Sequence, residues 1–263
     1  MKNFFIILFL FITLNHQSDY SQVLNEVGDD FCDFINKGGH LASDFIKFDK
    51  STQLNFLGSA VLIGTGYSID NNVKNFSQRN ISTFNNDLFS IDNYYGSEYT
   101  FIAIGGLYGY GLIFSDKDVR KLGLQTIEAV GYSGIIESIL KSVVGRSRPY
   151  TNEGKANFHP INFSAATTSF PSGHSTVSFA VSTVLANNTD NIYLKIFFFS
   201  ASSLVSFARI YHNDHWFSDV ITGSFIGYFS GNYVSNITTA GNPGDSNISL
   251  NFSLTGVNIS LAF

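Results

Sequence analysis

The sequence predicts an all-α protein, a bundle of helices followed by a small C-terminal β-hairpin. Long apolar stretches recur between residues 40 and 235 with almost no strand-like alternation. Charged residues make up only 13% of the 263 residues, about half the share in an ordinary soluble domain. Regular alternation of apolar and polar residues is confined to the last positions, where a glycine-containing turn interrupts it.

The first residues have the composition of an export signal. Lys2 precedes an apolar run from Phe4 to Leu14, and polar residues follow up to Ser18. Eleven residues span about 16 Å as a helix, too short for a bilayer core of about 30 Å. We therefore expect residues 1–20 to be a signal peptide, or alternatively an uncleaved N-terminal anchor. The protein would then be exported and would be periplasmic or membrane-associated.

Helical segments follow in order along the chain. Residues 21–94 are expected to form an N-terminal helical and connecting region, with a helix over 54–69 and an Asn- and Ser-rich connection over 70–92. Residues 95–235 are expected to hold the functional core. Its helices are predicted over residues 99–114, 122–145, 175–186, 193–211 and 217–234.

The C-terminal tail, residues 236–263, has a different pattern. Apolar residues alternate with polar ones from Ile248 to Leu254 and from Val257 to Phe263, on either side of a turn that contains Gly256. This period of two predicts paired strands. A lone hairpin is marginally stable in water, so we expect it to pack on the helical body. An interaction or membrane-surface element is the alternative.

The apolar helices raise the question of whether the chain crosses a membrane. The best candidate segments, 99–114 and 196–210, have 16 and 15 residues, whereas a span needs about 20. The helix that ends near Lys141 also carries acidic residues in its middle. We therefore expect an exported domain that is soluble or membrane-associated rather than integral.

Composition excludes several classes of function. A net charge of −5 argues against a nucleic-acid-binding surface, so no nucleic-acid partner is expected. The single cysteine, Cys32, excludes an internal disulfide and a cysteine-rich metal site. The sequence shows no evident Asp/Glu cluster for metals, and we expect no metal and no organic cofactor. The oligomeric state is left open.

The first of three polar segments runs from Lys141 to Pro149. Lys141 and Arg148 are seven residues apart, so on a helix both would project from nearly one face. Pro149 disfavours helical geometry at Arg148 and is expected to end the helix there. Two permanent cations at a helix end suit an anionic ligand, and they also suit the helix dipole alone.

The second segment, Ser169 to Thr176, is typical of a helix start. Ser172 is a favourable N-cap residue, and the amides of Gly173 and His174 would point out of the helix N-terminus, where anions bind. The imidazole of His174 can donate a proton at neutral pH. An ordinary capped helix with a surface histidine is the alternative.

The third segment runs from Arg209 to Asp219. His215 and Asp219 are four residues apart and would be adjacent on one helix face. The carboxylate could then accept the proton of one imidazole nitrogen and leave the other nitrogen as a nucleophile. Asp214 is expected to cap this helix, and Arg209 to end the preceding one. A surface ion pair is the alternative for the His–Asp pair taken alone.

Together, the three segments supply the groups needed to bind a phosphate and transfer its phosphoryl group. Their order and spacing resemble the type 2 phosphatidic acid phosphatase (PAP2) superfamily, which also includes class A acid phosphatases and vanadium haloperoxidases. The family pattern is Lys-x6-Arg-Pro, then Pro-Ser-Gly-His, then Ser-Arg-x5-His-x3-Asp. The resemblance covers residues 95–235 and departs from the pattern at Ala208, where the family usually has serine. We expect this change to remove a supporting hydrogen bond.

The resemblance implies a role for each matched residue. His215 would be the nucleophile that forms a phosphohistidine, Asp219 would orient it, and His174 would be the general acid and later activate water. The phosphate would be held by Lys141, Arg148, Ser172, Gly173 and Arg209. His212 and Asp214 match no motif position and are interpreted as local structure. The family fold is a helical bundle with the site at one end.

The expected function is metal-independent hydrolysis of a phosphomonoester outside the cytoplasm. The substrate could be a lipid phosphate, an isoprenyl pyrophosphate, a lipid A phosphate or a soluble ester, and the 27 Phe and 13 Tyr residues favour a lipid-linked one. Vanadate, a mimic of the phosphoryl transition state, is expected to inhibit. The alternatives are a vanadate-dependent haloperoxidase and a non-catalytic binding or structural protein on the same scaffold.

Overall fold

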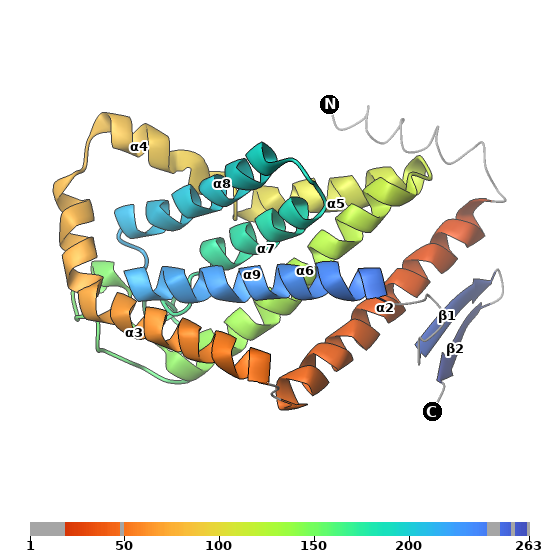
Figure 1. The fold of residues 1–263 in the computed structure, drawn as a ribbon, viewed down its shortest axis with the longest axis horizontal. Helices are drawn as coiled ribbons and strands as arrows, with labels where there is room; N and C mark the ends of the chain where they lie inside the picture. Colours follow the sequence, from red (N-terminus) through yellow and green to blue (C-terminus); the bar gives the residue numbers. More distant parts are fainter. Residues whose placement is uncertain (1–18, 48–49, 241–247, 254–255, 262–263) are drawn as a thin grey trace. The chain divides into compact units, whose positions relative to one another are not determined.

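The computed structural model describes residues 19–47, 50–240, 248–253 and 256–261. Every named element before residue 241 is helical (Figure 1), which confirms the predicted all-α class. The helices are α2 (Asp19–Lys47), α3 (Lys50–Arg79), α4 (Thr83–Phe89), η1 (Ser90–Asn93), α5 (Glu98–Ile113), α6 (Lys117–Val144), η2 (Pro149–Thr151), η3 (Ala165–Thr167), α7 (Gly173–Asn187), α8 (Ile192–Tyr211) and α9 (Phe217–Ala240), the three labelled η being short 3-10 helices. The signal peptide expected over 1–20 lies outside the described residues, except for two positions that begin α2.

Two compact units make up the chain. One comprises residues 46–240, and the other is formed by the residues before 46 and after 240. The second unit contains β1 (Ile248–Ser253) and β2 (Gly256–Leu261), which pair antiparallel with Ile248 opposite Leu261. These strands fall where the alternation predicts a hairpin, while the turn at 254–255 lies outside the described residues. The expected packing of the hairpin on the helical body stays a prediction.

In the unit of residues 46–240, α7 is the central helix. It packs against α6, α8 and α9, and Figure 1 shows it between α8 and α9. The buried positions of α7 carry mostly small side chains, among them Ser175, Thr176, Ser178, Ala180, Ser182 and Thr183. Hydroxyl groups join the helices, since Ser202 on α8 donates to the carbonyl oxygen of Ser178 at 3.0 Å. Small side chains therefore let these helices approach closely and satisfy their polar groups.

The contact between α7 and α9 depends on glycine. A Cβ at Gly227 would lie 2.2 Å from the carbonyl oxygen of Thr176, so a larger residue would push the two helices apart. This close packing fixes the first turns of both helices relative to each other. There the amide of Ser172 donates to the carbonyl oxygen of Asp219 at 3.1 Å. The helix pair thereby brings the second and third polar segments together.

The Asn- and Ser-rich stretch over 70–92 differs from the prediction. It is largely helical rather than a connection, because α3 continues to Arg79 and α4 and η1 follow. Asn and Ser have modest intrinsic helix propensity. Asp70 and Ser77 are nevertheless buried, at 0% and 1% exposure, so tertiary contacts stabilise the helix here.

The C-terminal end of α6 also differs. The helix ends at Val144, and Gly145 caps it in the left-handed conformation with φ +60°. A Cβ at Gly145 would lie 1.9 Å from the carbonyl oxygen of His159, so only glycine fits here. Glycine, and not Pro149, therefore ends the helix. As a result Arg148 lies in an extended segment and not on the helix face that carries Lys141.

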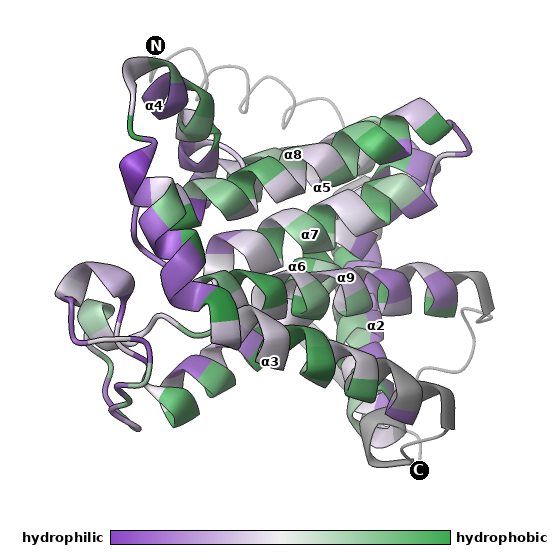
Figure 2. Ribbon diagram, turned by 60° about the vertical axis from the view of Figure 1, so that its left-hand side comes forward, coloured by the Kyte–Doolittle hydropathy of each residue, from purple (hydrophilic) through white to green (hydrophobic). Residues whose placement is uncertain are grey.

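Large apolar side chains are exposed on the outer faces of several helices. Figure 2 shows apolar stretches along α5 and α8. The exposed residues include Phe101, Ile102 and Ile113 on α5, and Ile192, Tyr193, Ile196 and Phe197 on α8. Of the described helices, α8 is the one that is long and apolar enough to cross a membrane, by length and composition.

Candidate active site

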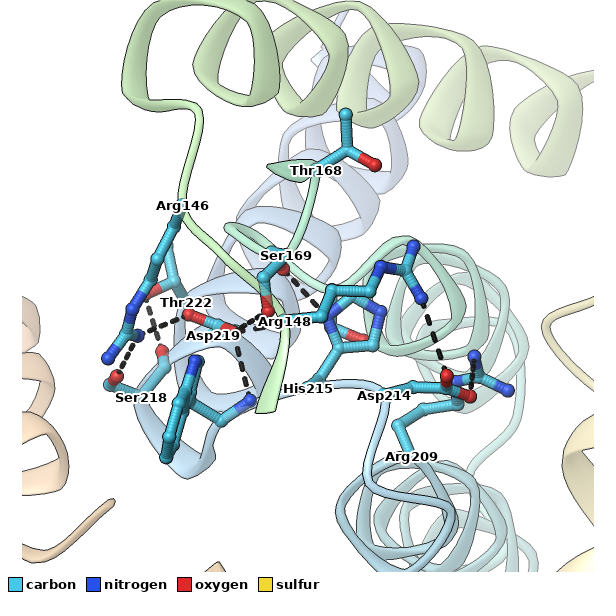
Figure 3. A network of polar contacts seen from close by, with 12 residues as sticks. Arg146, Arg148, Thr168, Ser169, Arg209, Asp214, His215, Ser218, Asp219 and Thr222 are labelled. Carbon is cyan, nitrogen blue, oxygen red and sulfur yellow. Dashed lines mark hydrogen bonds and ion pairs between the residues drawn. The ribbon is translucent and has the colours of Figure 1, made fainter. Parts of the chain in front are cut away.

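The three polar segments converge where α6 and α8 end and α7 and α9 begin (Figure 3). Arg148 and Arg209 meet at a shared carboxylate, that of Asp214. The Nη2 of Arg209 donates to Asp214 Oδ2 at 2.6 Å, and the Nη1 of Arg148 lies 3.6 Å from Asp214 Oδ1. The first and third segments, 61 positions apart at these two arginines, are therefore neighbours in space.

Both arginines have unused hydrogen-bond donors. The Nε atoms of Arg148 and Arg209 are buried, and neither has a hydrogen-bond partner within the described part of the chain. The other terminal nitrogen of Arg209, Nη1, donates to Oδ2 of Asp92 in η1 at 2.8 Å. A buried donor without a partner is costly. The two Nε–H groups are thus suited to an anion that enters between these side chains.

Lys141 brings the third cation to the start of α7. Its Nζ pairs with Glu137, one turn earlier on α6, at 2.5 Å. A Cβ at Gly173 would lie 2.9 Å from Glu137 Oε1 and 3.4 Å from the Nζ of Lys141. Glycine at this position therefore lets the α7 N-terminus, with its free amide groups, lie against the lysine.

Ser172 occupies the N-cap position of α7, as predicted, but its hydroxyl does not cap the helix. Its Oγ instead accepts from the hydroxyl of Ser175 at 3.1 Å, and Ser172 is fully buried. The prediction was thus right for the position and wrong for the hydrogen bond. The helix N-terminus is left for another acceptor.

His215 is held by a backbone carbonyl. Its Nδ1 lies 2.6 Å from the carbonyl oxygen of Ser169, and the side chain is 2% exposed. A carbonyl can only accept, so Nδ1 carries the proton and Nε2 keeps its lone pair. The direct hydrogen bond expected from Asp219 is absent, because Asp219 Oδ2 lies 3.9 Å from Nδ1.

The reason is that His215 precedes α9 and does not share a helix face with Asp219. The carboxylate of Asp219 accepts from the amide of Trp216 at 2.9 Å. Asp219, and not Asp214, therefore binds an amide group at the start of α9. It also accepts from the hydroxyl of Ser169 at 2.6 Å. Ser169 therefore stands between the carboxylate and the imidazole, as Figure 3 shows.

The comparisons with known proteins identify the family of this chain. The model of the PAP2 superfamily matches residues 122–242. Undecaprenyl-diphosphatase from Sulfolobus acidocaldarius is 30% identical over 173 residues, which cover 63% of this chain and 78% of that protein. This chain belongs to the PAP2 superfamily.

Other PAP2 relatives match over a shorter region. Lipid A 1-phosphatases from Rhizobium etli and Rhizobium johnstonii are 33% and 31% identical over 115 residues, 43% of this chain. The match spans about half the length of these two proteins, 49% and 46% respectively.

Two solved structures share the fold. One is LpxE from Aquifex aeolicus, with a TM-score of 0.51, 23% identity, and coverage of 64% of this chain and 95% of that one. The other is the transmembrane PAP2-type phosphatidylglycerolphosphate phosphatase from Bacillus subtilis, with a TM-score of 0.57, 21% identity and coverage of 72% and 96%. These likenesses place the helical unit in the PAP2 fold.

The electrostatics of the PAP2 site keep both histidines neutral. Burial lowers the pKa of His215 well below its usual value, and the charges of Arg148, Arg209 and Lys141 lower this pKa further. Burial likewise lowers the pKa of His174 to about 4, with Arg209 as the next cause. Arg209 and Lys141 therefore act on both predicted catalytic imidazoles, whereas Arg148 acts on that of His215.

Several residues of the site lie outside the PAP2 motif. Asp214 pairs with two arginines. The prediction that it caps α9 was wrong, because Asp219 accepts from the amide of Trp216 at the start of that helix. Asp92 lies before the expected core of residues 95–235, yet holds Arg209. Ser169 begins the second polar segment, three positions before the Pro-Ser-Gly-His serine, but the sequence predicted no role for it. Its role depends on where its carbonyl points, which only the fold decides.

His212 and Ala208 lie at the edge of this arrangement. The Nε2 of His212 is 3.2 Å from the carbonyl oxygen of Phe89 and 3.5 Å from Asp92 Oδ1. Ala208 is fully buried in an apolar cluster with Phe89 and Tyr211. A serine at position 208 would therefore lie among apolar side chains.

Proposed function

We propose that this protein hydrolyses a phosphate monoester through a phosphohistidine intermediate on His215. The observation that carries the proposal is the pair of Nε–H groups of Arg148 and Arg209, which have no partner among the described residues, beside an imidazole whose Nε2 is unprotonated. Donors that are already in place need not reorganise when charge develops. Such donors are the main source of transition-state stabilisation in phosphoryl transfer.

In the first step, the lone pair of His215 Nε2 attacks phosphorus and the P–O bond to the leaving group breaks. The leaving oxygen takes a proton from His174. In the second step, water attacks the phosphohistidine, His174 takes the proton of that water, and the N–P bond breaks. Phosphate leaves with the proton that His174 has taken from water, and both imidazoles return to the neutral form of the free protein. Lys141, Arg148 and Arg209 stabilise the equatorial oxygens in both steps.

The proton that His174 donates must come with the substrate. His174 is neutral in the free protein above about pH 4, because burial and the nearby cations lower its pKa. A phosphate monoester has a second pKa of about 6, so its monoanion carries one proton into the site. The negative charge of the phosphate also offsets the cations and raises the pKa of His174. Both effects favour transfer of the proton to His174.

For the substrate we propose a lipid-linked phosphate or diphosphate at the outer side of a membrane. The relatives named lipid A 1-phosphatase and undecaprenyl-diphosphatase support this class. The exposed apolar faces of α5 and α8 supply a surface that a membrane could cover. We further propose that the reaction needs no metal ion and that the protein acts outside the cytoplasm.

The test is phosphate release from phosphatidic acid, undecaprenyl diphosphate and p-nitrophenyl phosphate by detergent-solubilised full-length protein. Release from the lipids with little from the soluble ester supports the lipid proposal, whereas the reverse assigns a soluble substrate. His215→Ala should lower turnover at least about 10⁴-fold and abolish acid-labile labelling from a ³²P substrate. Retained turnover in this variant would overturn the mechanism.

Two additions separate the remaining alternatives. EDTA should leave the rate unchanged, and a requirement for Mg²⁺ would contradict the metal-free proposal. Vanadate should inhibit phosphate release. Peroxide-dependent bromination in the presence of vanadate would instead indicate a haloperoxidase, and an absence of both activities would indicate a non-catalytic role.

A further inference from the structure

Arg146 lies two residues before Arg148 but belongs to a different environment. Its side chain is only 2% exposed, and four hydrogen bonds from its guanidinium group fix it. Its Cζ lies 5.1 Å from the ring centre of Tyr67 and 5.3 Å from that of Trp216, so the group is packed against two aromatic faces. No phosphate could reach a guanidinium enclosed in this way.

The partners of Arg146 are two buried carboxylates from distant helices. Its Nη1 pairs with Asp219 Oδ1 at 2.5 Å, and its Nη2 pairs with Asp70 Oδ2 of α3 at 2.7 Å. Both aspartates are 0% exposed. A buried charge is tolerated only when it is paired and hydrogen-bonded, so these three groups depend on one another.

Asp70 also holds the first turn of α9. Its Oδ1 accepts from the amide of Ser218 at 2.8 Å, and its Oδ2 accepts from the hydroxyl of Ser218 at 2.8 Å. The same hydroxyl accepts from the Nη1 of Arg146 at 2.8 Å. Asp70 therefore fixes the residue next to Asp219 as well as the guanidinium that Asp219 contacts.

The network reaches the nucleophile through Ser169. The carboxylate of Asp219 accepts from the Ser169 hydroxyl at 2.6 Å, and the backbone carbonyl of Arg146 accepts from the Ser169 amide at 3.0 Å. The remaining polar group of Ser169, its carbonyl oxygen, accepts from His215 Nδ1 at 2.6 Å. Two of the three hydrogen-bonding groups of Ser169 are thus fixed by Arg146, directly or through Asp219, and the third orients the imidazole.

From this geometry we propose that Asp70 and Arg146 are positioning residues for His215. They hold Asp219 and Ser169 so that the Ser169 carbonyl keeps the proton on Nδ1 and leaves Nε2 free to attack. Asp70 lies on α3, outside the residues matched by the PAP2 model, so this assigns α3 a part in the reaction. The kinetic test of this inference rests on the proposed function. The spectroscopic test depends only on the tautomer of the His215 imidazole.

The kinetic test uses Asp70→Asn, which keeps the shape of the side chain and removes its charge. We expect kcat to fall about 10- to 100-fold, the range for groups that orient a functional histidine through a partner. KM should change less than about two-fold, since Lys141, Arg148 and Arg209 are untouched. Arg146→Lys should behave similarly, because a lysine keeps the charge but cannot contact both carboxylates in the same geometry.

The spectroscopic test needs no turnover. In protein labelled with ¹⁵N-histidine, the His215 signals are assigned by their loss in His215→Ala. The wild type should show one tautomer with the proton on Nδ1, whereas Asp70→Asn should show exchange between tautomers. Ser218→Ala removes one hydrogen bond to each of Asp70 and Arg146 without a change in charge, and it replaces Asp70→Asn if that variant does not fold. We expect an intermediate loss of kcat and the same change in the spectrum.

Lys74→Ala is the matched control. Lys74 lies one turn after Asp70 on α3, and its Nζ donates to the carbonyl oxygen of Pro149 at 2.7 Å, so it also joins α3 to the loop after α6. Its removal should lower stability while leaving kcat and the tautomer unchanged. A wild-type tautomer and kcat in Asp70→Asn, or equal effects in Asp70→Asn and Lys74→Ala, would overturn the positioning role. An inactive wild type with the expected tautomer change would overturn only the proposed function.

Discussion

Arg146 and Arg148 are separated by one residue, yet one is a buried structural group and the other a candidate ligand-binding group. Arg146 has four hydrogen bonds and two carboxylate partners. Arg148 has one loose pair, at 3.6 Å to Asp214, and a buried Nε without a hydrogen-bond partner in the described structure. The number of its N–H donors that have partners therefore distinguishes an arginine that stabilises the fold from one that is suited to bind an anion.

The carboxylates near the two arginines differ in the same way. Asp70 and Asp219 beside Arg146 are 0% exposed and fixed by several donors. The side chain of Asp214 beside Arg148 is 25% exposed. Water can solvate Asp214 when it moves, whereas the buried pair has no such alternative. On the proposed function, we therefore expect an incoming phosphate to displace Asp214 and to leave the network around Arg146 intact.

Exchange of each arginine for alanine should separate the two roles most strongly. Arg148→Ala should lower kcat/KM about 10²- to 10³-fold, because a donor to the transition state is lost, and should lower the free energy of unfolding by less than about 1 kcal/mol. Arg146→Ala should lower the free energy of unfolding by about 3–5 kcal/mol, since it leaves buried carboxylates unpaired. Denaturant titration and initial rates measure the two quantities. Equal stability losses in both variants would remove the distinction.

The pH dependence tests the neutral histidines on the Arg148 side. The groups that act on His174 are Arg209 and Lys141, which lower its pKa, and Asp92 and Asp214, which raise it, with burial as the largest cause of its fall to about 4. We expect kcat/KM to rise as the pH falls from 8 to about 6, where the substrate monoanion forms. Between about pH 6 and pH 4, kcat/KM should stay high. His215 stays unprotonated in this range because its own pKa is also lowered.

Folding must be followed at each pH in this experiment. Both histidines bind a proton more readily in the unfolded chain than in the folded one, so they destabilise the fold as the pH falls below about 6.5. Circular dichroism separates this loss from a change in the reaction. A kcat/KM that increases from pH 6 to pH 8 would contradict the substrate-borne proton.

Asp214→Asn should have the smallest effect and sharpens the comparison between the carboxylates. It removes a negative charge that competes with phosphate for Arg148 and Arg209. Inorganic phosphate and vanadate should then inhibit about 3- to 10-fold more tightly, as expected for a partly exposed carboxylate that pairs with two arginines. Inhibition constants at two salt concentrations measure this. Weaker inhibition would show that Asp214 positions the arginines instead of competing for them.

The motif positions could be predicted from the sequence because their spacing is local. The motifs identify Lys141, Arg148, His174, Arg209 and His215, and the structure brings them together. The helical class was predictable for the same reason, since apolar periodicity is a property of consecutive residues. The end of the helix predicted over 122–145 also agrees with the observed end at Val144. The requirement for glycine at position 145 could not be predicted, because it comes from the carbonyl of His159, a contact that no local pattern contains.

What the sequence alone determined is the set of reactive groups and the helices that carry them. The tertiary structure decided which groups touch. It placed Ser169 instead of Asp219 against the imidazole, recruited Asp70 from α3, and assigned Asp214 to two arginines. Hydrogen bonds and buried ion pairs depend on distances of a few tenths of an ångström between residues far apart in the chain. Such distances exist only after the helices have packed.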